Sequence, residues 1–136
     1  NGYTYAHRNI GINYTKIEFV CTIYSLCNFY GFCNSTGAGI GVRLDARAGI
    51  QNVILSVTSA WIGQPGGNSQ TISHTLPAGG TFTVTMERSG TLYTISINGI
   101  VVGTVTSTIT PGDYFSVGGD NAGGTWDTLK SITAYP

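Results

Sequence analysis

The sequence predicts an all-β protein built as an antiparallel two-sheet β-sandwich. No segment of the 136 residues has a sustained helical period. Short runs in which apolar and polar residues alternate recur along the chain, and Gly- and Pro-rich turns separate them. The clearest run is 81–104, which the turn signals Ser89-Gly90 and Asn98-Gly99 divide into three strands. These three observations favour a sandwich over any helical architecture.

The two turns of 81–104 also predict a register, because a two-residue turn fixes which residues face each other. The first turn would place Met86 opposite Tyr93, and the second would place Ile97 opposite Ile100. Both registers gather one apolar set on a single face, as a half-buried sheet requires. The predicted apolar set is Phe82, Val84, Met86, Tyr93, Ile95, Ile97, Ile100 and Val102.

Other alternating runs predict further strands. An edge strand followed by a turn is expected within 1–14, and a half-buried strand is expected over 16–25. The runs 40–46 and 52–59 predict neighbouring antiparallel strands, and 71–76 predicts a short one. In the last of these, His74 shares a face with apolar neighbours and is expected to be a partly buried, hydrogen-bonded histidine.

Two stretches lack alternation. Residues 26–39 are rich in Gly, Asn and aromatic residues and predict a loop or irregular hairpin. Its aromatic side chains, Phe29, Tyr30 and Phe32, either cover the core or form a contact surface. Residues 60–70 predict a second loop around Pro65-Gly66-Gly67.

The chain after 104 predicts a short strand over 114–117, a Gly-rich surface loop over 118–127 and a final strand over 127–135. In the final strand Leu129 and Ile132 are spaced by an odd number of residues. Both can point inward only if the strand contains a bulge.

Composition excludes several functional classes. The net charge is zero and only 9% of residues are charged, which argues against a nucleic-acid partner. No apolar run reaches the roughly 20 residues of a membrane helix, so membrane insertion is not expected.

The size predicts a single domain over 1–136, and the missing start Met suggests a chain processed or excised from a longer one. A neutral Gly, Ser and Thr surface is typical of secreted or particle-surface β proteins, so an extracellular location is expected.

Three cysteines, Cys21, Cys27 and Cys33, are spaced by six residues. One pair among them is a candidate disulfide, with its connectivity left open by the sequence. The spacing is not that of a zinc site, which would also need His7 or His74 as a fourth ligand.

The second half of the chain resembles a known fold. It contains a hairpin with ING at its tip (97–99), a connection ending in FSVGGD (115–120), a Gly-rich loop closed by Trp126 and a last strand ending in Tyr135. Together these resemble the concanavalin A-like lectin/glucanase superfamily, and within it laminin-G-like domains, best over 81–135. The resemblance implies a jelly roll of two antiparallel sheets, often with a carbohydrate-binding concave face or a metal site at a loop edge.

No catalytic residue follows from this resemblance, because the clustered E-x-D-x-E of the glucanase members is absent, and so is the galectin-like pattern of His, Asn, Arg and a Trp-to-Glu-to-Arg run. Glycoside hydrolysis needs two facing carboxylates. The acids are Glu18, Asp45, Glu87, Asp113, Asp120 and Asp127. A pair such as Glu18 and Asp45 could meet across strands, but nothing in the sequence requires it, so we do not expect an enzyme.

Binding is the better hypothesis, with carbohydrate recognition or adhesion as the function. Sugars are recognised by aromatic faces and planar polar groups, and the 118–127 loop offers Trp126, Asp120, Asn121 and Asp127. Asp120 and Asn121 are also candidate oxygen ligands for Ca²⁺, and no other cofactor is expected. In the alternative interpretation, Trp126 plugs the core and Asp120 only forms a turn.

Further candidates lie outside that loop. Tyr114 and Trp61 are secondary ligand-binding candidates on neighbouring loops, and the polar face of the 81–104 sheet is an alternative site (Thr83, Thr85, Thr94 and Ser96). The rival function is a structural or decoration subunit of a virus, phage or extracellular fibre, as a homo-oligomer or larger assembly. Asn13 and Asn34 each begin an N-glycosylation sequon.

Overall fold

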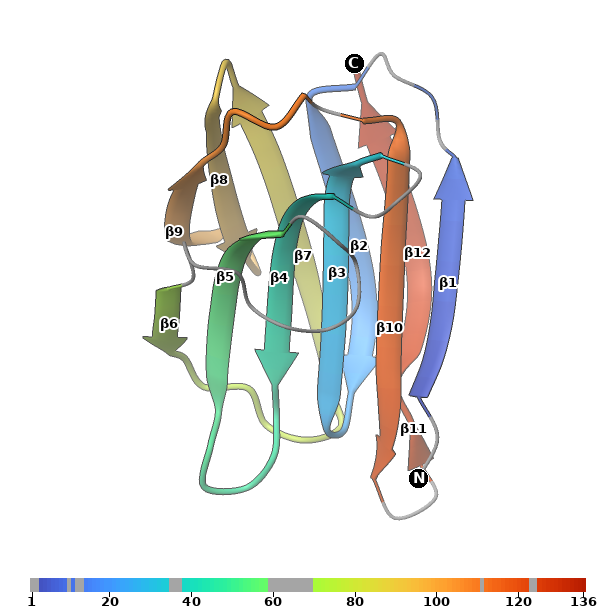
Figure 1. Ribbon diagram of the computed structural model, residues 1–136. Coiled ribbons are helices and arrows are strands. Elements are labelled where there is room, and N and C mark those ends of the chain that lie inside the picture. Colours follow the sequence, from blue (N-terminus) through green and yellow to red (C-terminus); the bar gives the residue numbers. More distant parts are fainter. Residues whose placement is uncertain are drawn as a thin grey trace.

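The computed structural model describes the backbone of residues 3–9, 11, 14–34, 38–58, 70–110, 112–122 and 125–136. It describes the side chains of the same residues except 3–8, 58, 120–122 and 125–126. The described chain is arranged in two packed β-sheets (Figure 1). It contains no helix able to span a membrane.

Every strand pair in both sheets is antiparallel. The seven-stranded sheet has the order β1 (Tyr3–Asn9), β10 (Tyr114–Ala122), β3 (Leu26–Cys33), β4 (Gly39–Asp45), β5 (Asn52–Thr58) and β6 (Gln70–Ser73), with β11 (Thr125–Trp126) paired to β10. The five-stranded sheet has the order β12 (Thr128–Tyr135), β2 (Lys16–Ile23), β7 (Gly80–Ser89), β8 (Leu92–Ile97) and β9 (Ile100–Thr106). The predicted all-β two-sheet sandwich is confirmed, with β1 as an edge strand.

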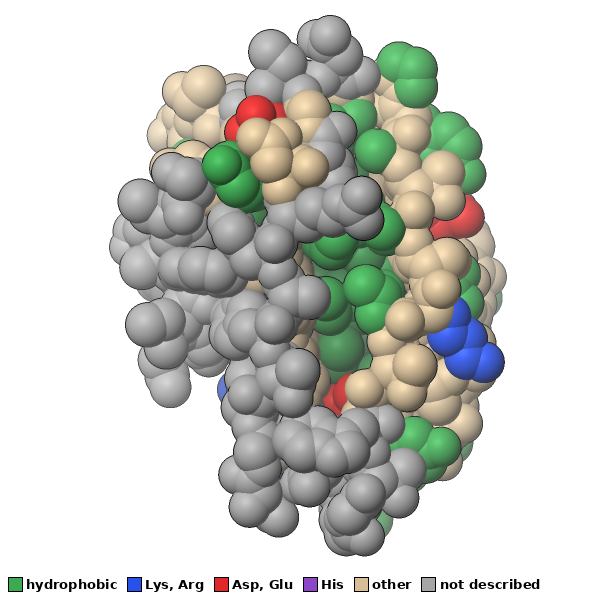
Figure 2. Space-filling model, turned by 90° about the vertical axis from the view of Figure 1, so that its right-hand side faces the viewer, with side chains coloured by type: hydrophobic (Ala, Val, Ile, Leu, Met, Phe, Trp, Pro, Cys, Tyr) green, Lys and Arg blue, Asp and Glu red, His purple; other side chains and the backbone are tan. Residues whose placement is uncertain are grey.

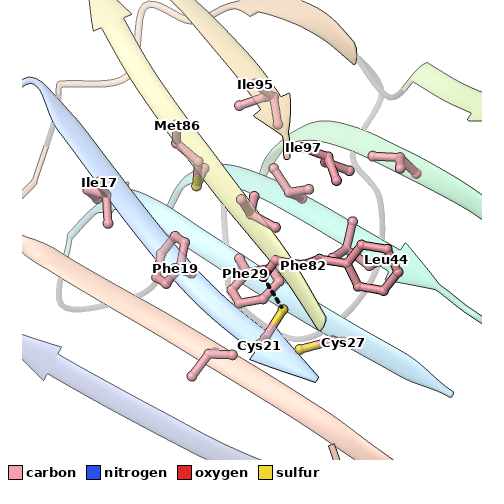
Figure 3. Close-up of a cluster of buried hydrophobic side chains, with 14 of the residues drawn as sticks. Ile17, Phe19, Cys21, Cys27, Phe29, Leu44, Phe82, Met86, Ile95 and Ile97 are labelled. Atoms are coloured by element: carbon pink, nitrogen blue, oxygen red, sulfur yellow. Dashed lines mark hydrogen bonds between the residues drawn. The ribbon is translucent and has the colours of Figure 1, made fainter. Parts of the chain in front are cut away.

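The core lies between the two sheets. In β2 every second side chain is buried, as its alternation predicts. Phe19 of β2 packs against Phe29 of β3, with ring centroids 4.7 Å apart, so aromatic contacts join the two sheets (Figure 3). Burying each such side chain stabilises the fold by roughly 1.5–3 kcal/mol. At the side where β1 and β12 form the sheet edges, hydrophobic side chains are visible from outside (Figure 2).

The three-strand unit β7–β8–β9 is confirmed, but its first register is wrong. Ser89 pairs with Leu92, so the turn is Gly90-Thr91 and Met86 faces Ile95 instead of Tyr93. This slip of two residues leaves the inward face unchanged, because side chains alternate with a period of two.

The second register of this unit begins as predicted and then changes. Ile97 pairs with Ile100, and a bulge after the next pair, Ser96 and Val101, places Gly103 opposite Ile95. The bulge turns Val105 towards the core, where it is buried. Ile100, expected in the core, keeps its predicted partner and is nevertheless 65% exposed.

The predicted loop over 26–39 is wrong in its first half, where β3 runs through the middle of the seven-stranded sheet. Both faces of β3 are buried, so no alternation marks it in the sequence. Phe29 and Phe32 join the core cluster, whereas Tyr30 is buried outside that cluster. A positive φ of 54° at Phe32 ends the regular strand geometry.

The predicted loop over 118–127 is also corrected. β10 continues to Ala122 and pairs with β11 as a hairpin, so Asp120 and Asn121 are strand residues. In contrast, the predicted bulge in the last strand is confirmed between Leu129 and Ser131. The strand expected over 71–76 is β6, which ends at Ser73.

All three cysteines are free and buried, so the expected disulfide is not formed in the structure. Cys21 and Cys27 come from opposite sheets and face each other within the core (Figure 3). The Cys21 thiol donates a hydrogen bond to the carbonyl of Phe82 at 3.7 Å. Cys33 donates instead to the carbonyl of Tyr114 at 3.1 Å.

Candidate functional site

The outer face of the seven-stranded sheet is polar in an otherwise weakly charged protein. In β3, β4, β5 and β10 the core residues alternate with side chains that must point to the opposite face. We call this set the outer polar face. Its described members include Asn28, Tyr30, Arg43, Asp45, Asn52, Ile54, Ser56 and Ser116.

Strand register places several of these side chains in one row. Arg43 of β4 lies opposite Asn28 of β3 on one side and opposite Ile54 of β5 on the other. Ile54 in turn lies opposite Thr71 of β6. With strands about 4.8 Å apart, the row from Arg43 to Thr71 spans about 10 Å, close to the length of a disaccharide.

Unpaired polar atoms concentrate on this face. Among the described residues, four buried side-chain atoms have no hydrogen-bond partner, and three of them belong to the outer polar face: Arg43 Nε, Asn52 Oδ1 and Ser116 Oγ. Buried polar groups in folded proteins are nearly always hydrogen-bonded, so such atoms call for an explanation. Arg43 Nε is a donor and Asn52 Oδ1 an acceptor on half-buried side chains, whereas Ser116 is fully buried and out of reach of a molecule resting on the face.

Asp45 is the described carboxylate of this face, and it forms an ion pair with Arg47. The Asp45 carboxylate accepts hydrogen bonds from the Arg47 side chain at 2.9 and 2.7 Å, and from the Arg47 backbone N–H at 3.1 Å. Burial alone would raise the pKa of Asp45, but these hydrogen bonds and the charges of Arg47 and then Arg43 lower it. Asp45 is therefore ionised and neutralised by Arg47 at neutral pH.

The outer polar face has a buried half and a partly exposed half. On β3, β10 and the adjoining part of β5, Tyr30, Ser116 and Ser56 are all buried. Tyr30 and Ser56 crowd the space above Gly41, where an added Cβ would lie 3.0 Å from each. Asp45 of β4 is buried too, whereas Arg43, Asn52 and Ile54 are half-buried and Thr71 of β6 is exposed. Access for a ligand therefore increases from Arg43 towards β6.

An open pocket adjoins this partly exposed half. It has a volume of about 300 Å³ and is lined by Ile50, Gln51, Ser73, His74 and Thr75. The side-chain oxygen of Gln51 accepts a hydrogen bond from the Leu76 N–H at 3.2 Å, and Gln51 itself has a positive φ of 45°. His74 is half-buried, and its backbone N–H donates to the Gln51 carbonyl at 3.4 Å.

Most of the ligand-binding residues predicted from sequence cannot be compared with this face. Trp61 lies outside the described residues, as do the side chains of Asp120, Asn121 and Trp126. Their roles in glycan or Ca²⁺ binding stay predictions.

The two predicted residues that are described have structural contacts. The Asp127 carboxylate accepts hydrogen bonds from the backbone N–H groups of Tyr24 at 2.6 Å and Ser25 at 3.4 Å. Tyr114 is half-buried, and its carbonyl accepts a hydrogen bond from the Tyr14 hydroxyl at 3.4 Å.

The four residues of the alternative site on the five-stranded sheet are uncharged. Thr83, Thr85, Thr94 and Ser96 are half-buried on its outer side, as predicted. Neighbouring residues on this face bond to each other, as Thr22 and Thr81 do at 3.0 Å between hydroxyls.

The carboxylate pair considered from sequence does not exist. Glu18 alternates with core residues of the five-stranded sheet, whereas Asp45 lies on the outer face of the seven-stranded sheet. The whole sandwich separates them. Glu87 shares the face of Glu18 but lies opposite Lys16. The described residues also contain no group of three or more His, Cys, Asp and Glu able to hold a metal.

Of the two sequons, Asn13 lies outside the described residues. Asn34 is exposed, and its side-chain oxygen accepts a hydrogen bond from the Ala38 N–H at 3.1 Å.

Sequence reasoning missed the outer polar face as a site. Arg43 and Asp45 were visible as the polar phase of a strand, but that phase by itself suggests only solvated side chains. The available signal was the sequence Asp45-x-Arg47. It allows Arg47 to form the ion pair with Asp45, so that Arg43 is not needed for that pair.

No protein-family model matches the sequence, and no curated protein matches it either. Solved structures do match. A tetrameric galectin from the ball sponge Cinachyrella sp. is similar with a TM-score of 0.74 and 17% identity, over 98% of this chain and 100% of that chain. The carbohydrate-binding module CBM66 from Bacillus subtilis has a TM-score of 0.64 and 10% identity, over 100% of this chain and 83% of that chain.

An enzyme shares the same architecture. A β-glucanase from Bacillus licheniformis is similar with a TM-score of 0.67 and 12% identity, over 90% of this chain and 66% of that chain. Identities this low establish the fold and leave ligand and activity open. The closer resemblance to laminin-G-like domains stays a prediction. The lectins, the binding module and the glucanase agree on one architecture, and this chain has the concanavalin A-like lectin/glucanase fold.

Proposed function

We propose that this chain is a non-catalytic carbohydrate-binding module and that its ligand rests on the outer polar face, over β4, β5 and β6. The observation that carries the proposal is that two half-buried side chains of β4 and β5, Arg43 and Asn52, each hold a buried polar atom without a hydrogen-bond partner. The fold similarity to a galectin and to a carbohydrate-binding module supports the same conclusion.

The chemistry of this face suits a sugar. Each sugar hydroxyl both donates and accepts hydrogen bonds, so the hydroxyls of a sugar suit the Arg43 donor as well as the Asn52 acceptor. The half-buried Ile54 lies between Arg43 and Thr71 and offers an apolar contact to the C–H face of a sugar ring.

Catalysis is not part of the proposal. Hydrolysis of a glycosidic bond needs two carboxyl groups about 5–10 Å apart, one on each side of the bond. Asp45 is the described acid of the outer polar face, and it is an ionised carboxylate paired with Arg47. A bound sugar would therefore meet no acid–base pair among the described residues of this face.

A glycan array probed with the full chain tests the proposal. We expect binding that Asn52→Ala and Ile54→Ala each weaken about tenfold, the effect of losing one hydrogen bond or one apolar contact. Thr85→Ala, on the outer side of the other sheet, is the matched control and should leave binding unchanged.

Two further arms separate this site from its rivals. Loss of binding in Trp126→Ala, with Asn52→Ala unaffected, would move the site to the β10–β11 hairpin. Loss on adding a chelator would support the Ca²⁺ role predicted for Asp120 and Asn121. A chain that binds no glycan, or that releases reducing ends from one, would refute the proposal.

A further inference from the structure

We infer that the saccharide carries an anionic group, a carboxylate or a sulfate, which binds to Arg43. This inference rests on the proposed carbohydrate-binding function and names the class of sugar that the outer polar face would select. The selected ligand would be an acidic polysaccharide or a glycan with an acidic residue.

The charges on the outer polar face do not cancel. Its described side chains and the adjoining Arg47 supply two cations, Arg43 and Arg47, and one anion, Asp45. Arg47 binds both oxygens of Asp45, at 2.9 and 2.7 Å. Arg43 makes no hydrogen bond or ion pair with any described residue, and its Nε is buried without a partner. The described residues of this face, together with Arg47, thus carry one more positive charge than negative.

A partly buried cation without a partner is costly, because little water remains to solvate it. An anion on the ligand would remove that cost and form a charge-assisted hydrogen bond. The planar fork of an arginine matches the two oxygens of a carboxylate or a sulfate. A neutral sugar would satisfy Nε but leave the charge unpaired.

The position of Arg43 fits recognition of one substituent on a sugar chain. It lies in the row that continues through Ile54 to Thr71, so a ring resting on Ile54 would place a substituent over Arg43. The protein as a whole does not attract polyanions, since its formal net charge is zero. Preference for an acidic ligand would therefore be local to this site.

The test uses acidic polysaccharides and their neutralised forms. The full chain is titrated at 0.15 M salt with polygalacturonate, alginate, hyaluronan and a sulfated galactan, each beside its carboxyl-reduced or desulfated product. We expect at least one acidic polymer to bind about ten- to a hundredfold more tightly than its neutral product. Carboxylated and sulfated arms tell which anion the site prefers.

Three variants assign the preference. Arg43→Gln should abolish it, and Arg43→Lys should retain only part of it, because lysine has the charge without the fork. Lys130→Gln removes the same charge from an exposed position in β12 and should change nothing. Thermal unfolding of each variant checks folding, and Arg43→Lys alone carries the test should Arg43→Gln fail to fold.

Each other outcome is decisive. Equal binding of acidic and neutral polymers would overturn the inference and leave the carbohydrate-binding proposal standing. If Lys130→Gln reduced the preference as much as Arg43→Gln, the inference would also be overturned. Attraction of an anionic polymer to any positive charge on the protein would then explain the result. Absence of binding to every polymer and to the glycan array would refute both.

Discussion

The carboxylate of Asp127 accepts a 2.6 Å hydrogen bond from the backbone N–H of Tyr24, which lies 103 residues earlier in the chain. Its Cβ also packs against Gly119, where an added side-chain carbon would lie 2.8 Å away. Asp127 thereby joins the start of β12 to the turn between β2 and β3 and to β10. Because β3 and β10 belong to the other sheet, this contact fixes one end of the sandwich.

Asp127→Ala should therefore destabilise the fold. It leaves the Tyr24 N–H without its acceptor, at a cost of about 1–3 kcal/mol in the free energy of unfolding. Denaturant unfolding followed by tryptophan fluorescence measures the change. Asp113→Ala is the control, because Asp113 accepts an exposed hydrogen bond from the Asn9 side chain and should cost less than about 1 kcal/mol. Equal stability of the two variants would contradict this role of Asp127.

The Asp45–Arg47 pair predicts a pH dependence of stability. The pKa of Asp45 is lowered in the folded state, so the unfolded chain takes up a proton first as pH falls. The stabilisation is complete above the unfolded value of about 4 and disappears as pH falls through the folded pKa. At pH 7, Asp45→Asn should lower the free energy of unfolding by about 1–2 kcal/mol, with half-exposed Arg47 limiting the effect.

The same variant supplies the acid test. The difference in unfolding free energy between wild type and Asp45→Asn should shrink as the pH falls below 4, because the wild-type carboxyl is then protonated too. Glu87→Gln changes the net charge equally from an exposed position and should not reproduce the pattern. A difference that stays constant from pH 7 to pH 3 would rule out the proposed linkage.

The thiols should be inert in the folded protein. Burial raises the pKa of Cys33 to about 12. Hydrogen bonding to Cys21, followed by burial, raises the pKa of Cys27 well above its ordinary value. Since the thiolate is the reactive form, a disulfide reagent at pH 8 should modify the native protein at least a hundredfold more slowly than the unfolded protein.

Counting thiols tests the pairing as well. Without a reductant, the unfolded wild type should yield three thiols per chain, and Cys27→Ser should yield two. A single thiol in the unfolded wild type would mean that a disulfide forms after all. Fast modification of the native protein would mean that the sandwich opens readily.

Alternation predicted strands with one polar face and failed for strands buried on both faces. β2 and β7 were found because their polar side chains point to solvent. β3 was read as a loop because its outward residues, such as Tyr30, are buried as well. The hairpin turn slipped from Ser89-Gly90 to Gly90-Thr91 because glycine fits either central position of such a turn, so composition does not choose between them.

The candidate site was harder to predict from the sequence than the fold was. Arg43 and Asp45 are two residues apart and share a face by strand geometry alone. The sequence does not show that Asp45 pairs with Arg47, or that Arg43 forms no ion pair with a described residue. Both depend on side-chain geometry just beyond the end of β4. The role of Asp127 was hidden for a related reason, because its partner Tyr24 belongs to a different hairpin.

Gly112 is the position where the fold should tolerate a side chain least. Its N–H donates to the Phe32 carbonyl at 3.0 Å, and its own carbonyl accepts the Tyr14 hydroxyl at 2.9 Å. A Cβ at this position would overlap the carbonyl group of Cys33 and lie 2.6 Å from the backbone nitrogen of Asn34. These are backbone atoms, which cannot move aside as a flexible side chain can.

Gly112→Ala should therefore lower the free energy of unfolding by about 3 kcal/mol or more, at the upper end of the cost of overpacking. Gly49→Ala is the matched control, since Gly49 has a φ of +81° and nothing within 4 Å of an added Cβ. That substitution strains only the backbone and should cost about 1–2 kcal/mol. Denaturant midpoints of the two variants, measured side by side, decide the matter: a midpoint for Gly112→Ala at or above that of Gly49→Ala would show that β3 and the start of β10 do not approach as closely as described.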